Sequence, residues 1–221
     1  MEAFTYLHLQ MRLEGKGIDN EHLMKQVEVV PDEELPLMLS AWLANEELIA
    51  YYSESISPDL QRDLTASMSD IEFPGIDPLL DVLKSHNIQS EAGHYKTCVF
   101  PSQPAWEIEV TCLSKHDPKV KAFGFDSFAE EVYAIERSGT LIAACVSTRE
   151  NEMCGEAWVY TLPEYRNQGL AQKVVNAWAG SLMDAGKVPF YSHKIENVAS
   201  ASLARKLGLQ PVFEEISITQ V

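Results

Sequence analysis

Hydrophobic positions recur at helical spacing in the first hundred residues of the chain. The longest example is LPLMLSAWLANEELIAYY, residues 35–52, in which apolar residues return every three or four positions, as on the buried face of an amphipathic helix. Pro31, Pro58 and Pro78 each stand beside acidic or hydroxyl side chains, a combination that favours the first turn of a helix. We therefore predict a mainly helical N-terminal region over residues 1–104, ending in the turn-forming segment PSQP.

Strand patterns dominate after residue 104. Six segments carry apolar residues in alternation or in short runs bounded by turns, namely 106–110, 132–136, 141–146, 156–161, 188–192 and 212–218. Ser138-Gly139 is a hairpin signal between the second and third of them. Two helices are predicted over residues 168–185 and 199–207, each followed by a glycine. The order of elements predicts an α/β domain over residues 105–221, whose sheet is mixed because the hairpin is antiparallel.

Acidic residues outnumber basic ones, and the formal net charge is −16. Residues 161–221 carry a net +1 and the first 160 residues carry −17. This balance argues against a basic surface for nucleic acid, so we expect no nucleic-acid partner. The acidic front half would attract a cationic substrate or form an ordinary solvated surface.

The N-terminal segment MEAFTYLHLQMRLEG lacks the basic start, apolar run and cleavage site of a signal peptide. No apolar stretch reaches the roughly 20 residues that span a bilayer. The four cysteines form no CxxC pair, the close spacing that zinc ligands usually show. Cys145 lies in the apolar run LIAACV and is expected to be buried, whereas Cys154 is expected to be exposed. We therefore expect a cytoplasmic protein with no membrane partner and no metal.

The segment TLPEYRNQGLA, residues 161–171, reads as a strand end, a tight turn and a helix start. N–H groups in the first turn of a helix have no partner within the helix, and the helix dipole adds partial positive charge, so such a turn binds pyrophosphate. A side chain at Gly169 would stand between those amides and the phosphates, although we expect the backbone there to tolerate one. The segment matches neither a P-loop nor the G-x-G-x-x-G dinucleotide pattern.

The letters RNQGLA within this segment fit the [QR]-x-x-G-x-[GA] pattern of GNAT acyltransferases, and PEYR matches the family's usual lead-in. Downstream, VPFYS and NVASASLARKLG are similar to the family's fifth strand and fourth helix. The resemblance covers about residues 133–218. More narrowly, the chain resembles a bacterial subgroup of mostly unassigned substrate that often carries a helical N-terminal extension. The resemblance implies a mixed, mostly antiparallel sheet flanked by helices, with acetyl-CoA as co-substrate.

The resemblance also implies which residues hold acetyl-CoA. Strand backbone would bind the pantetheine arm, the loop would bind the pyrophosphate, and two polar residues would lie near the pantetheine or adenosine end. These residues are Val159, Tyr160 and Thr161 on the strand, Arg166, Asn167, Gln168, Gly169, Leu170, Ala171 and Gln172 in the loop, and Asn197 and Ser200 beyond it. The last two would serve equally well as caps of the following helix, and both roles are open.

In the reaction that the resemblance implies, an amine attacks the thioester carbonyl directly within a ternary complex. A backbone N–H of residues 159–161 would polarise that carbonyl. The family often places an acid, a tyrosine, seven residues after the position of Asn197, but that position here is Ala204. Tyr191, Ser192 or water would have to replace it.

Two residues are candidates for the base that accepts the amine's proton. Glu156 is the first, because family bases often lie on that strand, and His193 is the alternative, because its ordinary pKa suits proton transfer. The sequence thus predicts an N-acetyltransferase that moves an acetyl group from acetyl-CoA to a primary amine of a small molecule or peptide.

Two other functions stay open at this point. One is a catalytically silent acyl-CoA-binding regulatory module, which the missing tyrosine favours. The other makes the helical region an interaction module that recruits a protein substrate. The sequence identifies neither the acceptor amine nor the oligomeric state, and a homodimer is one of the open alternatives.

Overall fold

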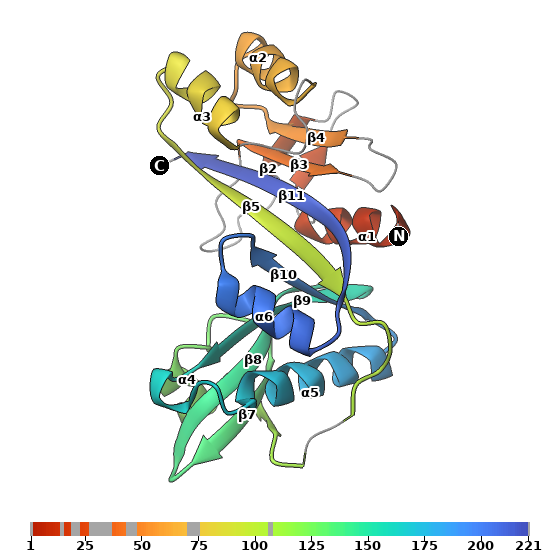
Figure 1. Ribbon diagram of the computed structural model, residues 1–221, viewed down its shortest axis with the longest axis vertical. Helices are drawn as coiled ribbons and strands as arrows, with labels where there is room; N and C mark the ends of the chain where they lie inside the picture. Colours follow the sequence, from red (N-terminus) through yellow and green to blue (C-terminus); the bar gives the residue numbers. More distant parts are fainter. Residues whose placement is uncertain are drawn as a thin grey trace. The chain divides into compact units, whose positions relative to one another are not determined.

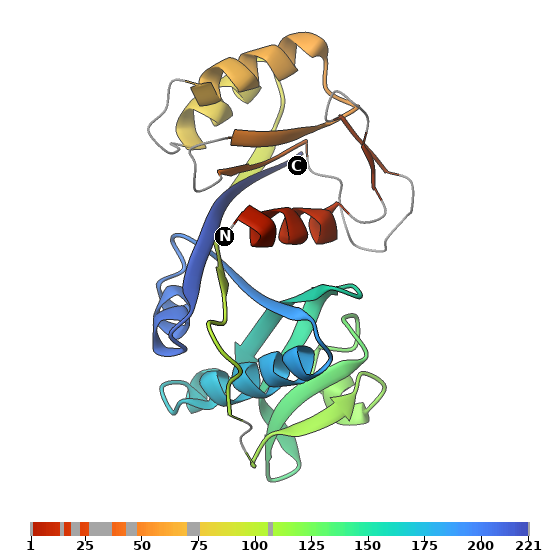
Figure 2. The same cartoon turned by 90° about the vertical axis from the view of Figure 1, so that its right-hand side faces the viewer.

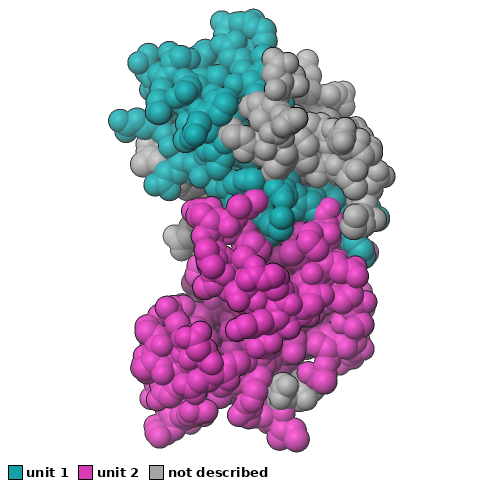
Figure 3. Space-filling view, in the orientation of Figure 1, with its two compact units in different colours: residues 1–5, 13–96, 213–221 teal, residues 6–12, 97–212 magenta. Residues whose placement is uncertain are grey.

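The structure is a computed structural model that describes residues 2–13, 16–18, 23–26, 37–42, 48–69, 76–105 and 108–220 (Figure 1). The chain forms two compact units (Figure 3). The first unit comprises residues 1–5, 13–96 and 213–221, and the second comprises residues 6–12 and 97–212. Two separate segments of the chain therefore make up the second unit. The division into separate domains at residue 104 stays a prediction.

The second unit is built on a sheet with helices on its faces. Its elements are β6 (Thr111–Ser114), α4 (Pro118–Phe123), β7 (Glu131–Arg137), β8 (Thr140–Glu150), β9 (Cys154–Thr161), the 3-10 turn η1 (Pro163–Tyr165), α5 (Leu170–Asp184), β10 (Val188–Lys194) and α6 (Val198–Lys206). The strand order is β10-β9-β8-β7-β6, in which β9 and β10 are parallel and the other neighbours are antiparallel. The predicted mixed, mostly antiparallel sheet flanked by helices is confirmed.

Helix α5 packs on one face of this sheet and α4 lies on the other (Figures 1 and 2). Side chains alternate between the two faces along a strand. Cys145 and its cross-strand partner Val159 therefore point toward α5, whereas Val146 and its partner Trp158 point toward α4. Strand β9 thus presents alternate residues to two different environments.

The hairpin between β7 and β8 forms as predicted. Ser138 and Gly139 have φ values of 51° and 83°, the left-handed backbone that a two-residue hairpin turn requires. Arg137 and Thr140 pair directly across it. This tight turn sets the register of the two central strands of the unit.

The first unit combines strands with helices. Its elements are β1 (Lys16–Ile18), β2 (Leu23–Gln26), β3 (Met38–Trp42), β4 (Leu48–Ser53), α2 (Pro58–Ser69), α3 (Ile76–Ser85) and most of β5 (Ser90–Val99) and β11 (Gln210–Gln220), while α1 (Glu2–Arg12) lies mostly in the second unit. The strand order in this unit is β1-β2-β4-β3-β11-β5. Leucines of α2 and α3, Leu60, Leu64, Leu79 and Leu83, form one core with residues of β3, β4 and β11.

The predicted helix over residues 35–52 is wrong. The structure forms β3 and β4 there, while residues 43–47 lie outside the described part of the chain. Met38–Trp42 pairs with Glu214–Ile218 of β11, so a partner near the other end of the sequence overrides the local pattern. The helix start expected at Pro31 also lies outside the described residues.

Two other local expectations have opposite outcomes. Ser57 caps α2 as predicted, because its Oγ accepts a hydrogen bond from the backbone N of Leu60 at 3.2 Å. The predicted strand over residues 106–110 is wrong where it is described, since Ile108 and Glu109 form a turn. The side chain of Ile108 is fully exposed. The alternation of apolar and polar residues in this segment therefore does not correspond to a buried strand face.

The cysteines also differ from expectation in one case. Cys145 is buried as predicted, but the expected exposure of Cys154 is wrong. Its Sγ lies 3.8 Å from the carbonyl oxygen of Leu7 and 3.7 Å from Sδ of Met11, because α1 covers this part of β9. The four cysteines form no disulfide with one another, and Cys112 is exposed.

Candidate functional site

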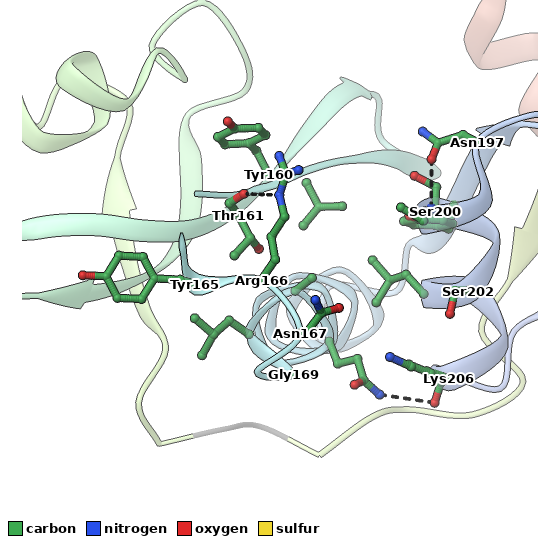
Figure 4. Close-up of a pocket in the computed structure, with 17 residues that line it drawn as sticks. Tyr160, Thr161, Tyr165, Arg166, Asn167, Gly169, Asn197, Ser200, Ser202 and Lys206 are labelled. Carbon is green, nitrogen blue, oxygen red and sulfur yellow. Dashed lines mark hydrogen bonds between the residues drawn. The ribbon is translucent and has the colours of Figure 1, made fainter. Parts of the chain in front are cut away.

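A pocket of about 460 Å³ lies among β9, the start of α5, β10 and α6 (Figure 4). All of the predicted cofactor residues except Gln168 line it. Residues that sequence reasoning did not assign to the site also line it, namely Tyr165, Ala199, Ser202, Leu203 and Lys206. The pocket thus brings the predicted strand, loop and helix positions together in one place.

One wall of the pocket is an edge of β9. Strands β9 and β10 are in register through Glu156, which lies opposite Phe190. Beyond this pair β9 continues to Thr161 and β10 to Lys194, and these two fully described stretches do not pair with each other. Because β9 pairs with β8 on its other side, its edge from Val159 onward can hydrogen-bond an extended ligand as another strand would.

The start of α5 forms a second wall. Asn167 and Gly169 have φ values of 61° and 77°, and Gly169 precedes the helix without any side-chain cap. The N–H groups of the first helical turn therefore have no intrahelical acceptor and carry the positive end of the dipole. Backbone turns with left-handed residues of this kind are common anion-binding sites.

The expectation that the backbone at Gly169 tolerates a side chain is wrong. A Cβ there would meet only Oε1 of Gln172, at 3.8 Å, so space is available. The left-handed φ of 77° would nevertheless cost any other L-residue about 1 kcal/mol.

Two cationic residues border the pocket from different elements (Figure 4). Nε of Arg166 donates to the carbonyl oxygen of Thr161 at 3.2 Å, and the guanidinium carbon lies 5.7 Å from the ring centroid of Tyr160. Lys206 stands at the end of α6, and its carbonyl accepts a hydrogen bond from Nε2 of Gln172 at 3.4 Å. Positive charge therefore flanks the helix start on both the strand side and the α6 side.

Helix α6 contributes one face to the pocket. Ala199, Ser202, Leu203 and Lys206 recur at spacings of three and four, which places them along one side of a helix. That spacing was the signal in the sequence that could have added them to the predicted site.

Asn197 caps this helix, whereas Ser200 lies within its first turn. Oδ1 of Asn197 accepts a hydrogen bond from the backbone N of Ser200 at 3.0 Å. The capping role of Asn197 is therefore confirmed, and both residues also line the pocket. Their role in holding acetyl-CoA stays a prediction.

Tyr191 is the catalytic candidate that lines the pocket. It is buried on β10 in the same core as Ala204. Burial raises the pKa of Tyr191 to about 12, and its hydrogen bond with Ser200 acts in the opposite direction. The phenol therefore keeps its proton at neutral pH and can donate a hydrogen bond into the pocket.

Glu156 lies outside the pocket lining, buried beneath α1. Oε1 is 3.3 Å from Nε2 of His8, and Oε2 accepts a hydrogen bond from Nη1 of Arg149 at 3.0 Å. Burial by itself would raise the pKa of Glu156, but the charges of His8 and Arg149 outweigh it and hold the pKa below its usual range. A carboxylate held in this way is a weak base.

His193 and Gln168 also lie away from the pocket lining. Nδ1 of His193 donates to the carbonyl oxygen of Lys194 at 2.9 Å, which leaves Nε2 as the acceptor of a neutral ring. Nε2 of Gln168 donates to the carbonyl oxygen of Glu164 at 3.5 Å. The catalytic role of His193 and the cofactor role of Gln168 stay predictions.

No group of three or more His, Cys, Asp or Glu side chains among the described residues is arranged to hold a metal ion. No helix in the described part is long and apolar enough to cross a bilayer.

Comparison with known proteins points to one family. Residues 124–214 match the sequence profile described as GNAT acetyltransferase. An uncharacterized N-acetyltransferase, YdfB of Bacillus subtilis (strain 168), is 35% identical over 94 residues, which are 42% of this chain and 33% of that protein. The chain therefore matches about a third of the length of this curated relative.

Solved structures share the fold. A GCN5-related N-acetyltransferase-like protein from Streptococcus suis superposes with a TM-score of 0.52 at 13% identity, covering 87% of each chain. An acetyltransferase from the GNAT family of Colwellia psychrerythraea gives a TM-score of 0.50 at 10% identity, covering 93% of this chain and 80% of that one. The profile match thus assigns a GNAT acetyltransferase domain to residues 124–214, and the solved structures share its fold.

Proposed function

We propose that the chain is an N-acyltransferase that moves an acetyl group from acetyl-CoA to a primary amine. The observation that supports this most strongly is the pocket, in which the open edge of β9 meets the start of α5. An extended amide chain would bind to the first of these, and a pyrophosphate would bind to the second.

The residues present fit a CoA thioester. Backbone groups of Val159 to Thr161 would pair with the pantetheine amides. The first turn of α5, with Arg166 and Lys206 beside it, would bind the phosphates, since helix dipole and cations both favour negative charge. The apolar side chains of Leu170 and Leu203 would cover the methylene groups between them.

In the proposed reaction the amine nitrogen forms a bond to the acetyl carbonyl carbon, and the carbon–sulfur bond breaks. The nitrogen loses a proton and the sulfur gains one, so the products are an amide and a thiol. A backbone N–H on the edge of β9 would donate to the carbonyl oxygen and stabilise the charge that develops there. The protonated phenol of Tyr191 is our candidate proton donor to the sulfur, because Ala204, at the position of the family's tyrosine, has no acidic group.

The base in this reaction is the least specified part. Glu156 was predicted for it, but its ion pairs and its distance from the pocket lining argue against that role. His193, with Nε2 as its acceptor, or a water molecule would then accept the proton of the amine. We also propose a cytoplasmic location, in keeping with a small-molecule or peptide amine as acceptor.

The test of the cofactor site is a matched pair of glycine substitutions. Gly169 and Gly186 both have a φ of 77° and open space around the position of a Cβ, but only Gly169 lines the pocket. Gly169→Glu and Gly186→Glu should therefore lose similar stability, about 1 kcal/mol each from backbone strain. Only Gly169→Glu should also lose CoA binding, measured by isothermal titration calorimetry, because the new carboxylate blocks and repels the phosphates.

Three results would decide the matter. Absence of CoA binding by the parent chain at millimolar concentration would refute the proposal. Equal CoA affinity in Gly169→Glu and the parent would refute the placement of the phosphates. CoA binding without thiol release, across a panel of polyamines, amino acids and aminoglycosides, would favour the silent regulatory module that the absence of a tyrosine at Ala204 suggests.

A further inference from the structure

Four aromatic rings gather on the α4 face of the second unit, and we call them the aromatic surface: Phe123, Phe128, Trp158 and Tyr160. The rings of Phe128 and Trp158 are stacked, with centroids 5.8 Å apart and planes at 24°. Those of Phe123 and Tyr160 meet edge to face at 5.9 Å. Two residues of β9 thus carry rings that helix α4 and the following loop support from one side.

The aromatic surface is exposed where most large apolar side chains of this unit are buried. Trp158 and Tyr160 are 51% and 40% exposed. Contiguous exposed aromatic side chains are uncommon on soluble domains and usually mark a binding site. Phe128 covers one side of Trp158, so half of that ring is left to contact something else.

The position of this surface relates it to the pocket. Tyr160 belongs to both, because it lines the pocket and its ring lies on the α4 face beside that of Phe123. Helices α5 and α6 close the pocket on the opposite side of β9. A second substrate can therefore reach the edge of β9 from the α4 face, across Trp158 and Tyr160, without displacing CoA.

The charge around the aromatic surface is unevenly distributed. Lys121 lies on α4 two positions before Phe123, and the guanidinium carbon of Arg166 lies 5.7 Å from the ring centroid of Tyr160, so positive charge lies on that side. The segment 124–136, which carries Phe128, contains four acidic residues and no lysine or arginine. Three of them already make contacts, whereas Asp126, two positions before Phe128, is exposed and makes no ion pair with any residue in the described part of the chain. An ammonium group that approaches on the Phe128 side is therefore attracted by Asp126, and a carboxylate is repelled there.

We propose that the aromatic surface is the acceptor subsite, and that it selects primary amines attached to an aromatic or other flat apolar group. The inference rests on the proposed function. The open side of Trp158 stacks with the flat group of the acceptor, while the amine lies toward the edge of β9. A second copy of the chain could also cover exposed rings, but it would close the route by which the acceptor reaches Tyr160.

The experiment measures binding of three matched amines to the chain saturated with CoA, by isothermal titration calorimetry. We expect 2-phenylethylamine, which is flat, to bind more tightly than 2-cyclohexylethylamine, which is apolar but not flat, and n-propylamine to bind most weakly. Trp158→Leu keeps an apolar side chain but removes the ring, and should weaken 2-phenylethylamine about tenfold. The control is Met153→Ala, which removes an exposed apolar side chain (60% exposed) away from the aromatic surface, and it should change nothing.

Steady-state kinetics provide the second readout. Trp158→Leu should raise KM for 2-phenylethylamine about tenfold and leave kcat and CoA affinity nearly unchanged, because the ring contacts the acceptor and not the reacting atoms. Normal CoA binding with equal affinity for all three amines would overturn the inference and leave the proposed function standing. A parent dimer that Trp158→Leu converts to monomer in analytical ultracentrifugation would also overturn it, by showing that a second copy covers the rings. Failure of the parent chain to bind CoA would refute both the proposed function and the acceptor subsite.

Discussion

Glu156 is held by two partners, one distant and one close in the sequence. His8 reaches it from α1, and Arg149 reaches it from the neighbouring strand β8. The ring of His8 also meets Phe190 edge to face, with centroids 5.0 Å apart. We infer that the paired charge of Glu156 stabilises the packing of α1 on the sheet, because removing either partner would leave a buried charge unpaired and lower the free energy of unfolding.

We expect Glu156→Gln to lower the free energy of unfolding by about 3 kcal/mol, since breaking a buried ion pair costs this much. Glu152→Gln, an exposed neighbour, is the control and should cost almost nothing. Because the pKa of Glu156 is held below its usual range, its contribution is complete at neutral pH and is lost in acid. The gap between parent and Glu156→Gln in urea unfolding should therefore narrow below about pH 4.

Turnover of the same variant tests the catalytic alternative. A base at Glu156 would lose roughly 100- to 10,000-fold in kcat when replaced by glutamine. The ion-paired geometry instead predicts a change of only a few fold, at a temperature where the variant is folded. A gap in unfolding free energy that does not depend on pH would contradict the ion-pair assignment.

Two helices of the second unit each begin with a side-chain N-cap, one beside the pocket and one away from it. Asn197 caps α6 beside the pocket, and Asp117 caps α4 by accepting a hydrogen bond from the backbone N of Lys119 at 2.8 Å. Only the first of these caps lines the pocket. The pair therefore separates a capping role from a binding role.

Asn197→Ala and Asp117→Ala should each lower the free energy of unfolding by about 1 kcal/mol, the usual cost of a lost N-cap. We expect Asn197→Ala alone to weaken CoA binding as well, by several fold, because its amide borders the pocket. Chemical unfolding and calorimetry of the two variants measure the two effects independently. If CoA affinity is the same in both variants, Asn197 is a cap and nothing more.

The elements that the sequence predicted well are those with local signals. Helix α5 and the β7–β8 hairpin carry an apolar stripe and a turn signal of their own, and the loop before Gly169 carries a recognisable motif. Strands β3 and β4 were missed because their apolar residues suit either a helix or a strand, and the choice depends on pairing with β11. Helix α4 was overlooked although Asp117-Pro118 and Gly124 mark its two ends.

The site was predictable to the same extent. Residues of the strand edge and loop follow one another in the sequence, so a motif was enough to find them. His8, one of the two partners of Glu156, lies 148 residues away, and no local pattern indicates that contact. For the same reason the stacking of Trp158 on Phe128 is a property of the folded sheet rather than of either segment.

At the scale of the whole molecule, the second unit draws on residues from before position 105. Tyr6–Arg12 belongs to it, as does the end of β5, where Oγ1 of Thr97 lies 2.9 Å from Oγ of Ser192 on β10. In the following linker, Nε2 of Gln103 donates to Oδ1 of Asp184 at 2.5 Å. A cut at residue 104 would remove all of these contacts.

A fragment of residues 105–221 should therefore be much less stable than the full chain. We expect its melting temperature, followed by circular dichroism, to be lower by at least about 15 °C, because several kilocalories of packing and pairing are lost. The control is a full chain with a short Gly-Ser insertion at residue 104, which interrupts the linker and removes nothing. Equal melting temperatures of fragment and full chain would show that residue 104 is an independent domain boundary.

Cys112 has a practical consequence for measuring acetyl transfer. Three of the four thiols are buried and Cys112 is exposed, so a colorimetric reagent that reports released CoA will also label the enzyme itself, at one equivalent per chain. Partial burial and the nearby charge of Glu131 raise the pKa of Cys112, and less thiolate means slower labelling. The background will thus be a slow drift rather than an initial burst, easily mistaken for weak turnover. Assays of slow acceptors should begin with the Cys112→Ser chain.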